Sequence, residues 1–182
     1  MVEGYLRQSA LAHLHLDARA ANEPDVGNAS VEMGERQFLG MINLRGQIRD
    51  PAFAPTVTKT LGFSLPDEVN MVTGNPDGIH ILCLGPDEWL VVTPPNEEIR
   101  LHKKLINDLR ELHAAITVTG ESKTIIRLSG PRARDTLAKG CPLDLHPRAF
   151  GPGQCAQSLL ARANMIVHQV HADDAERSAT YD

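Results

Sequence analysis

The stretch that most constrains the fold runs from Thr124 to His168, because turn-forming residues divide it into short elements. Residues Thr124 to Leu128 form a run rich in β-branched side chains, which is typical of a strand. Ser129-Gly130-Pro131 follows, and a proline with its preset φ favours the first turn of a helix. Gly140 is placed to end that helix in a left-handed conformation. A proline-rich connection then leads to an apolar hairpin around Ala163-Asn164. The stretch predicts a rigid scaffold with no evident active site.

The rest of the sequence continues this alternation of short strands and helices. Strands are expected at residues 38–44, 69–72, 79–84, 89–92, 116–119 and 123–128, and a short one where Leu14 and Leu16 alternate with histidines. Helices are expected after Asp50-Pro51 and after an Asn96 cap. Strands joined mostly by hairpins favour an α+β fold, a largely antiparallel sheet with helices on one side. We predict one α+β unit over residues 1–182, with two interlocked halves, 1–93 and 94–182, as the alternative.

Apolar periodicity predicts which faces of the helices are buried. The first helix presents Phe53, Val57 and Leu61 at intervals of four, although Pro55 favours a later start or a kink. The buried stripe expected for the second helix is Ile99, Leu105, Ile106, Leu109 and Leu112. Trp89 is the sole tryptophan, and we interpret it as a core anchor rather than an interface anchor.

Composition narrows the classes of function. The net charge is −5, and acidic and basic residues are interspersed along the chain. This pattern argues against nucleic acid as a principal partner, because binding a phosphate backbone needs a stripe of basic residues. Aromatic residues make up 4% of the chain, too few for a platform on which bases stack. No apolar run approaches the length of a membrane span, and Glu3 with two histidines argues against a signal peptide. Three cysteines without a CxxC motif suit a reducing cytosol, so we expect a cytoplasmic location. The charge pattern and the lack of a long apolar run predict that the chain binds no nucleic acid and no membrane.

Histidine spacing offers a weak candidate for a metal site. His13 and His15 would share one face of a strand, and His168 and His171 have HxxH spacing. A metal site needs three or four converging ligands, and no cysteine or acidic cluster joins either pair. We therefore predict no metal and solvent-facing histidines.

The cysteines and the turns also lack the context that catalysis requires. Cys141 follows the end of a helix, where the dipole disfavours a thiolate, so a buried structural thiol is the better interpretation. Cys83 and Cys155 lie within apolar strands and are expected in the core. Neither GxGxxG nor GxxxxGK[ST] occurs, so the chain itself is predicted to bind no nucleotide cofactor.

Three separated segments resemble one known family. They are Met33–Gly46 (MGERQFLGMINLRG), Leu84–Val92 (LGPDEWLVV) and Arg127–Phe150 (RLSGPRARDTLAKGCPLDLHPRAF), with Cys155–Leu160 (CAQSLL) following. In this order they resemble the gamma subunit family of bacterial heterotetrameric sarcosine oxidase, from Met33 to about His168. The resemblance implies a fold related to the folate-binding aminomethyltransferases, such as the glycine cleavage T-protein.

The resemblance also implies a function. The complex would oxidatively demethylate sarcosine to glycine and transfer the one-carbon unit to tetrahydrofolate. FAD, FMN, NAD and tetrahydrofolate would belong mainly to the alpha and beta subunits, leaving this chain with no cofactor and no catalytic residue. The expected partners are the alpha, beta and delta subunits. Members of the family continue past Tyr181-Asp182 into an apolar strand and a tryptophan-containing helix, so we expect these two elements to be missing here.

Two alternatives stay open. The chain could instead be the equivalent subunit of an N-methylglutamate dehydrogenase-type complex, or a stand-alone folate-binding protein resembling the T-protein. For a subunit, a contact surface should use arginine and aromatic anchors beside apolar groups. The candidate subunit interface is Arg127, Arg132, Leu143, His146, Arg148 and Phe150.

Overall fold

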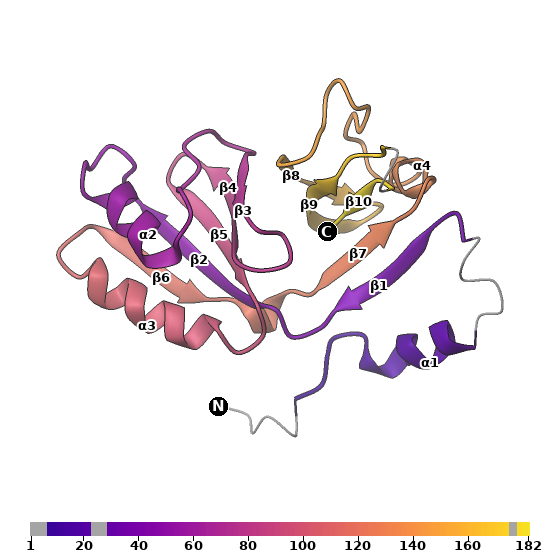
Figure 1. The fold of residues 1–182 in the computed structure, drawn as a ribbon, viewed down its shortest axis with the longest axis horizontal. Helices are drawn as coiled ribbons and strands as arrows, with labels where there is room; N and C mark the ends of the chain where they lie inside the picture. Colours follow the sequence, from indigo (N-terminus) through magenta and orange to yellow (C-terminus); the bar gives the residue numbers. More distant parts are fainter. Residues whose placement is uncertain (1–6, 23–28, 175–177) are drawn as a thin grey trace.

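The computed structural model describes residues 7–22, 29–174 and 178–182, whose strands form two five-stranded sheets (Figure 1). The first sheet contains, in spatial order, β3 (Val72–Gly74), β4 (His80–Gly85), β5 (Glu88–Thr93), β2 (Gly40–Gly46) and β6 (Ala114–Val118). The second contains β1 (Glu32–Arg36), β7 (Ile125–Ser129), β10 (Thr180–Tyr181), β9 (Ala163–His171) and β8 (Cys155–Leu160). Every neighbouring pair is antiparallel. The expected α+β fold with largely antiparallel sheet is confirmed.

The helices of the described residues are short. They are α1 (Leu16–Ala21), α2 (Phe53–Leu61), α3 (Glu98–Asp108) and α4 (Ala133–Ala138), with 3-10 turns η2 (Ala12–Leu14) and η4 (Gly120–Ser122). Helix α2 begins at Phe53 and contains Pro55 in its first turn, where a missing N–H breaks no intrahelical bond. It ends at Gly62, whose φ of 82° is left-handed, as expected for a helix stop.

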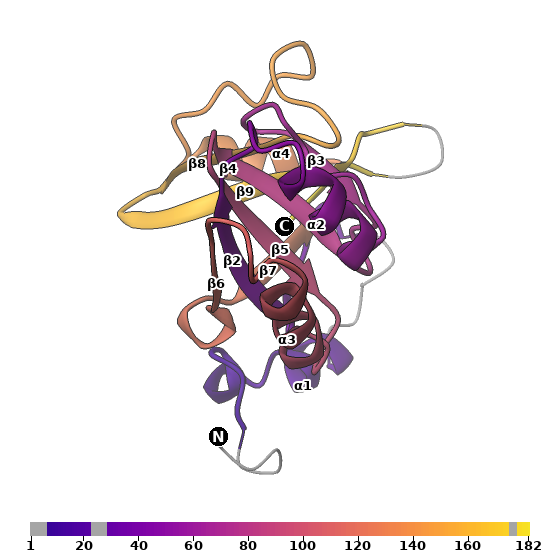
Figure 2. The same ribbon diagram turned by 90° about the vertical axis from the view of Figure 1, so that its left-hand side faces the viewer.

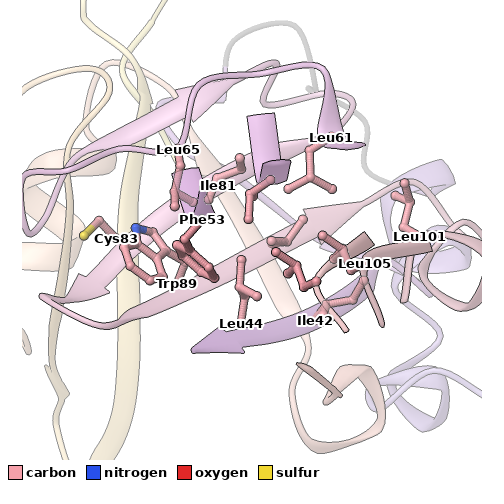
Figure 3. Close-up of a cluster of buried hydrophobic side chains, with 13 residues drawn as sticks. Ile42, Leu44, Phe53, Leu61, Leu65, Ile81, Cys83, Trp89, Leu101 and Leu105 are labelled. Carbon is pink, nitrogen blue, oxygen red and sulfur yellow. The ribbon is translucent and has the colours of Figure 1, made fainter. Parts of the chain in front are cut away.

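Helices α2 and α3 cover one face of the first sheet and enclose the largest apolar cluster (Figures 1 and 3). Trp89 is 1% exposed there and lies against Phe53, with 5.7 Å between the ring centroids. Its indole Nε1 donates a hydrogen bond of 2.7 Å to the carbonyl of Pro66. The interpretation of Trp89 as a core anchor is confirmed.

The opposite face of the first sheet packs against the second sheet. Met41, Leu82, Leu90 and Val92 from the first sheet form an apolar cluster with Cys155 of β8. The first sheet is thus buried on both faces, which explains why its central strands are continuous apolar runs rather than alternating ones. A further apolar cluster lies where the second sheet meets α4 and the segment after it, and contains Leu128, Ala133, Leu137, Leu145, Phe150, Val167, Ala179 and Tyr181.

The two sheets are connected through shared segments. Strand β1 leads into β2 through Phe38, a non-glycine residue with a φ of 62°. On the other side, the backbone of Asn70 donates to Cys83 O at 2.9 Å and accepts from Cys155 N at 2.7 Å. Asn70 therefore joins β4 of one sheet to β8 of the other. The number of independently folding units stays a prediction.

Several local expectations were wrong. The last hairpin turns at Ala161-Arg162, because Leu160 is opposite Ala163, and not around Ala163-Asn164. Residues around Leu14 and Leu16 form η2 and α1 instead of a strand, because a left-handed His15 with a φ of 49° separates two helical turns. Asn96 does not cap α3, since it has a φ of 69° and the helix begins at Glu98.

The buried face of α3 also differs from the expected stripe. Leu101, Leu105 and Leu109 are at most 2% exposed, whereas Ile99 is 40% and Ile106 47% exposed. Apolar residues occur on more than one side of this helix, and only its packing against α2 and the sheet selects which side is buried.

Candidate functional site

Charged and histidine side chains gather between the two sheets, beside the apolar cluster that joins them. Arg36 comes from β1, Arg127 from β7 and His168 from β9, while Asp182 follows β10. From the first sheet come Asp77, in the turn before β4, and His80, the first residue of β4. We call these six residues the intersheet polar cluster.

Asp182 is the centre of the ionic part of this cluster, and its side chain is 3% exposed. Arg127 donates to it twice, from Nε to Oδ1 and from Nη2 to Oδ2, both at 2.7 Å. Arg36 Nη1 donates to Oδ2 at 2.8 Å, and Arg127 Nη1 donates to Asp77 Oδ1 at 2.9 Å. Two arginines and two aspartates therefore neutralise one another, which leaves no net charge for a ligand.

The pKa values follow from this pairing. Burial alone would raise the pKa of Asp182, but the hydrogen bonds and charges of Arg127 and Arg36 outweigh burial and hold that pKa below its usual value. The bonds to Asp182 and Asp77 raise the pKa of Arg127. Asp182, Asp77 and Arg127 are consequently charged at neutral pH.

Removing the central carboxylate is expected to destabilise the fold. Asp182→Ala leaves two partly buried guanidinium groups without their main acceptor, which should lower the free energy of unfolding by about 2 kcal/mol. Urea unfolding followed by circular dichroism measures the change. The matched control is Glu97→Ala, which breaks the exposed Glu97–Arg100 pair and should change the free energy by under about 0.5 kcal/mol. Equal effects of the two variants would contradict a structural role for the cluster.

His80 and His168 form the other part of the cluster. They are 2% and 5% exposed, and their rings lie against each other at an interplanar angle of 35°, with centroids 5.4 Å apart. Burial lowers the pKa of His168 to about 4, helped by the neighbouring His80, and burial also lowers the pKa of His80. Both rings are neutral at pH 7. The expectation that His168 faces solvent is wrong, because β9 turns it toward the first sheet.

The other histidines of the metal candidates do not converge. His13 and His15 are exposed, as expected, but on a helical turn and its left-handed end rather than on a strand. Among the described residues, no group of three or more histidine, cysteine or acidic side chains is arranged to hold a metal ion. No helix in the described part of the chain is long and apolar enough to cross a membrane.

The three cysteines are all buried and unpaired by disulfides. Burial raises the pKa of Cys155 to about 12 and also raises that of Cys83, the opposite of what a nucleophile needs. Cys141 is 6% exposed, with Sγ 3.9 Å from the hydroxyl of Ser158. The expected burial of Cys83, Cys141 and Cys155 is confirmed, and their role as structural thiols rather than nucleophiles stays a prediction.

A hollow of about 360 Å³ lies between the segment Arg7–Ala18 and the residues Glu35–Phe38. The Arg7 guanidinium lies 5.1 Å from the centroid of the Phe38 ring. Glu35 at its wall accepts a hydrogen bond of 2.7 Å from the Thr124 hydroxyl. Two carboxylates, Glu35 and Asp17, on walls that also include Arg7 do not define a ligand chemistry.

The structure separates the six predicted interface residues into four groups. Arg127 belongs to the intersheet polar cluster, and Arg132 is paired with Asp135 at 2.6 Å on the surface of α4. Phe150, 7% exposed, and Leu143 pack in the apolar cluster beneath α4. His146 and Arg148 are exposed.

The segment after α4, residues 141–150, therefore has one side that faces the core and one that faces solvent. Leu145 and Phe150 face the core, while His146 and Arg148 face solvent. Its backbone is fixed by local bonds, because Arg148 N donates to His146 Nδ1 at 3.2 Å and His146 N donates to the Asp144 carboxylate at 3.0 Å.

Sequence reasoning missed four members of the intersheet polar cluster. They are Arg36, Asp77, His80 and Asp182. A signal was present for two of them: Arg36 ends an alternating strand, and His80 interrupts an apolar run. Their convergence could not be read from the sequence, since they are supplied by segments up to 146 positions apart.

Comparisons with the sequences of known proteins find one family. A sequence model described as "Sarcosine oxidase, gamma subunit family" matches residues 45–179. The chain is 32% identical over 138 residues to sarcosine oxidase subunit gamma of Corynebacterium sp. (strain P-1), covering 76% of this chain and 66% of that one. It is also 32% identical over 162 residues to the subunits of Arthrobacter sp. and Corynebacterium sp. (strain U-96), covering 89% of this chain and 76% and 77% of theirs.

Solved structures give the same result. A chain of the heterotetrameric sarcosine oxidase from Corynebacterium sp. U-96, in complex with pyrrole 2-carboxylate, matches with a TM-score of 0.81 and 29% identity. The match covers 97% of this chain and 86% of that chain. The aminomethyltransferase T of the glycine cleavage system from Bartonella henselae matches with a TM-score of 0.59 and 10% identity, over 84% of this chain and 41% of the other. This second likeness concerns the fold alone. The chain belongs to the sarcosine oxidase gamma subunit family.

Proposed function

We propose that this chain is the gamma subunit of a heterotetrameric sarcosine oxidase. The complex demethylates sarcosine oxidatively to glycine and transfers the one-carbon unit to tetrahydrofolate. The observation that carries the proposal is the match to a chain of such a heterotetramer over 97% of the sequence. The family match over residues 45–179 supports it.

Within the complex, this chain acts as a structural subunit without catalytic residues. FAD, FMN, NAD and tetrahydrofolate are held by partner subunits, mainly the alpha and beta chains, and the assembly works in the cytoplasm. The chemistry of the described residues supports this role. The charges of the intersheet polar cluster are balanced within the chain, and both cysteines with a shifted pKa are held as thiols.

The outer side of the segment after α4 contributes to subunit contacts. His146 and Arg148 are exposed there, on a backbone that its own hydrogen bonds and prolines hold in place, and this pre-ordering lowers the entropic cost of docking. Phe150 supports the segment from inside, so Phe150→Ser should destabilise the chain itself rather than only its contacts.

Co-expression with the alpha, beta and delta chains tests both points. A tagged form of this chain should retain the other three on purification, and the assembly should oxidise sarcosine. Arg148→Glu is expected to weaken retention about tenfold or more, because it places an acid where a cation contacts a partner. The amounts of co-purified subunits at matched concentration are the measurement.

The control is Arg110→Glu, the same charge reversal at a 69% exposed side chain beyond the end of α3. It should leave retention unchanged. Failure of every subunit to co-purify with the unaltered chain would overturn the proposed function. Full retention by Arg148→Glu would instead place the interface elsewhere on the chain.

A further inference from the structure

The outer edge of β8 has backbone groups that no described residue satisfies. Strand β8 is the last strand of the second sheet and pairs with β9 on one side only. Its turn to β9 is two residues long, since Leu160 is opposite Ala163. Figure 2 shows this hairpin projecting at the side of the molecule.

The hydrogen-bond pattern between β8 and β9 determines which backbone N–H and C=O groups of β8 point away from β9. Cys155 N donates away from β9, to Asn70 O at 2.7 Å, and Ala161 N donates to Gly140 O at 2.8 Å. In an antiparallel pair, alternate residues turn both N–H and C=O to the same side. Gln157 and Leu159, which lie between these two positions, therefore also point their N–H and C=O outward.

These outward groups belong to exposed residues, although the Gln157 side chain reaches the first sheet, where its Nε2 donates to Leu84 O at 3.0 Å. Among the residues that the structure describes, none accepts a hydrogen bond from the N–H of Gln157 or Leu159. Gln157 is exposed, and the side chains of Leu159 and Leu160 are 44% and 39% exposed. Proteins commonly protect an edge with charged residues or proline, and CAQSLL has neither.

The surroundings of the edge are basic, in contrast to the chain as a whole. Lys139 directly precedes Gly140 at one end of the edge, and Arg162 lies in the hairpin turn. Neither has an ion pair within the described ranges. The whole chain has a net charge of −5, so this local positive charge favours an acidic group on whatever docks here.

We propose that β8 accepts an extended segment of another subunit of the oxidase as an added strand. The proposal rests on the proposed function. Backbone donors and acceptors at strand spacing recognise an extended chain, and the stretch Gln157–Leu159, between the bonds of Cys155 to Asn70 and of Ala161 to Gly140, offers about 10 Å for it. The segment places apolar side chains beside Leu159 and Leu160 and a carboxylate near Lys139 and Arg162.

Amide hydrogen exchange compares the full-length chain alone with the assembled complex. In the complex, the amides of Gln157 and Leu159 should exchange at least about tenfold more slowly than in the free chain. The amides of Ala156 and Ser158 face β9 and should be protected in both samples. Equal exchange of Gln157 and Leu159 in the two samples would overturn strand addition.

A proline variant provides the second readout. Leu159→Pro removes one outward N–H and breaks no bond to β9, so the hairpin should keep its circular dichroism. It should reduce co-purification of the other subunits about tenfold. Leu159→Thr is the matched control, because it keeps the N–H and suits a strand. Full retention by Leu159→Pro would contradict the proposal.

The outcomes separate strand addition from the proposed function. If the complex assembles and the β8 amides stay unprotected, strand addition is wrong and the subunit assignment stands. If no subunit co-purifies with the unaltered chain, both are wrong. If the chain alone forms a dimer that protects the same amides, the occupant is a second copy and the proposal is wrong.

Discussion

Replacing Trp89 with alanine is expected to lower the free energy of unfolding by about 3–5 kcal/mol. The indole is 1% exposed, so the substitution creates a cavity in the middle of the largest apolar cluster. It also removes the tilted ring contact with Phe53 and leaves the buried carbonyl of Pro66 without its donor. These losses act on the same site and in the same direction.

Urea unfolding followed by circular dichroism measures this change. Fluorescence does not serve, because Trp89 is the sole tryptophan and disappears in the variant. Trp89→Phe retains a ring next to Phe53 and should lose clearly less than the alanine variant. Ile106→Ala, at a side chain 47% exposed on α3, should change stability by under about 0.5 kcal/mol. A loss at Trp89→Ala no greater than that of Ile106→Ala would show that Trp89 is not the anchor of the core.

Acid is expected to destabilise the fold because it protonates the buried pair His80 and His168. The pKa of His168 is about 4 in the folded chain and 6.5 when unperturbed, so the unfolded state binds more protons between these values. The destabilisation is therefore negligible above pH 6.5, where the ring is neutral in both states, and grows as the pH drops toward 4. The loss below pH 4 is on the order of 3 kcal/mol for His168. Burial also lowers the pKa of His80, so protonation of His80 adds to the loss of stability in acid.

The neighbouring charges bear on this pH range. Arg36 and Arg127 oppose protonation of His168, while Asp182 favours it. Asp182 itself stays ionised between pH 6.5 and 4, because its own pKa is held below the usual value. The decline in stability from pH 6.5 to about pH 5 therefore belongs to the histidines, and below about pH 5 the carboxylates with a lowered pKa, Asp182 and Glu35 among them, add to it.

Unfolding free energies measured at pH 7, 6, 5 and 4.5 test the effect. His168→Phe keeps a flat ring against His80 and removes a nitrogen, Nδ1, that lacks a hydrogen-bond partner among the described residues. It should flatten most of the pH dependence. His13→Phe, at an exposed position, should leave the slope as it is in the unaltered chain. An unchanged slope in His168→Phe would contradict the role of the buried pair.

The sequence by itself determined the type and order of most elements. Turn residues such as Gly62 and Ser129-Gly130-Pro131, and the apolar runs between them, act over a few neighbouring positions. The same local signals identified the buried stripe of α2, the core position of Trp89 and the buried cysteines. Sequence also determined the family, because three motifs kept their order along the chain.

Only the tertiary structure decided which side of ambiguous segments became buried. Helix α3 has apolar residues on several sides, and packing against α2 and the first sheet selected Leu101 and Leu105 over Ile99. His168 looked like a surface residue until β9 was placed over His80 of the other sheet. The partners of Asp182 were likewise set by the placement of β1 and β7 on one side of β10, because Arg36 and Arg127 come from the first two strands. Local propensity acts over a few residues, whereas the desolvation and pairing of a charge depend on contacts between segments that the sequence alone does not bring together.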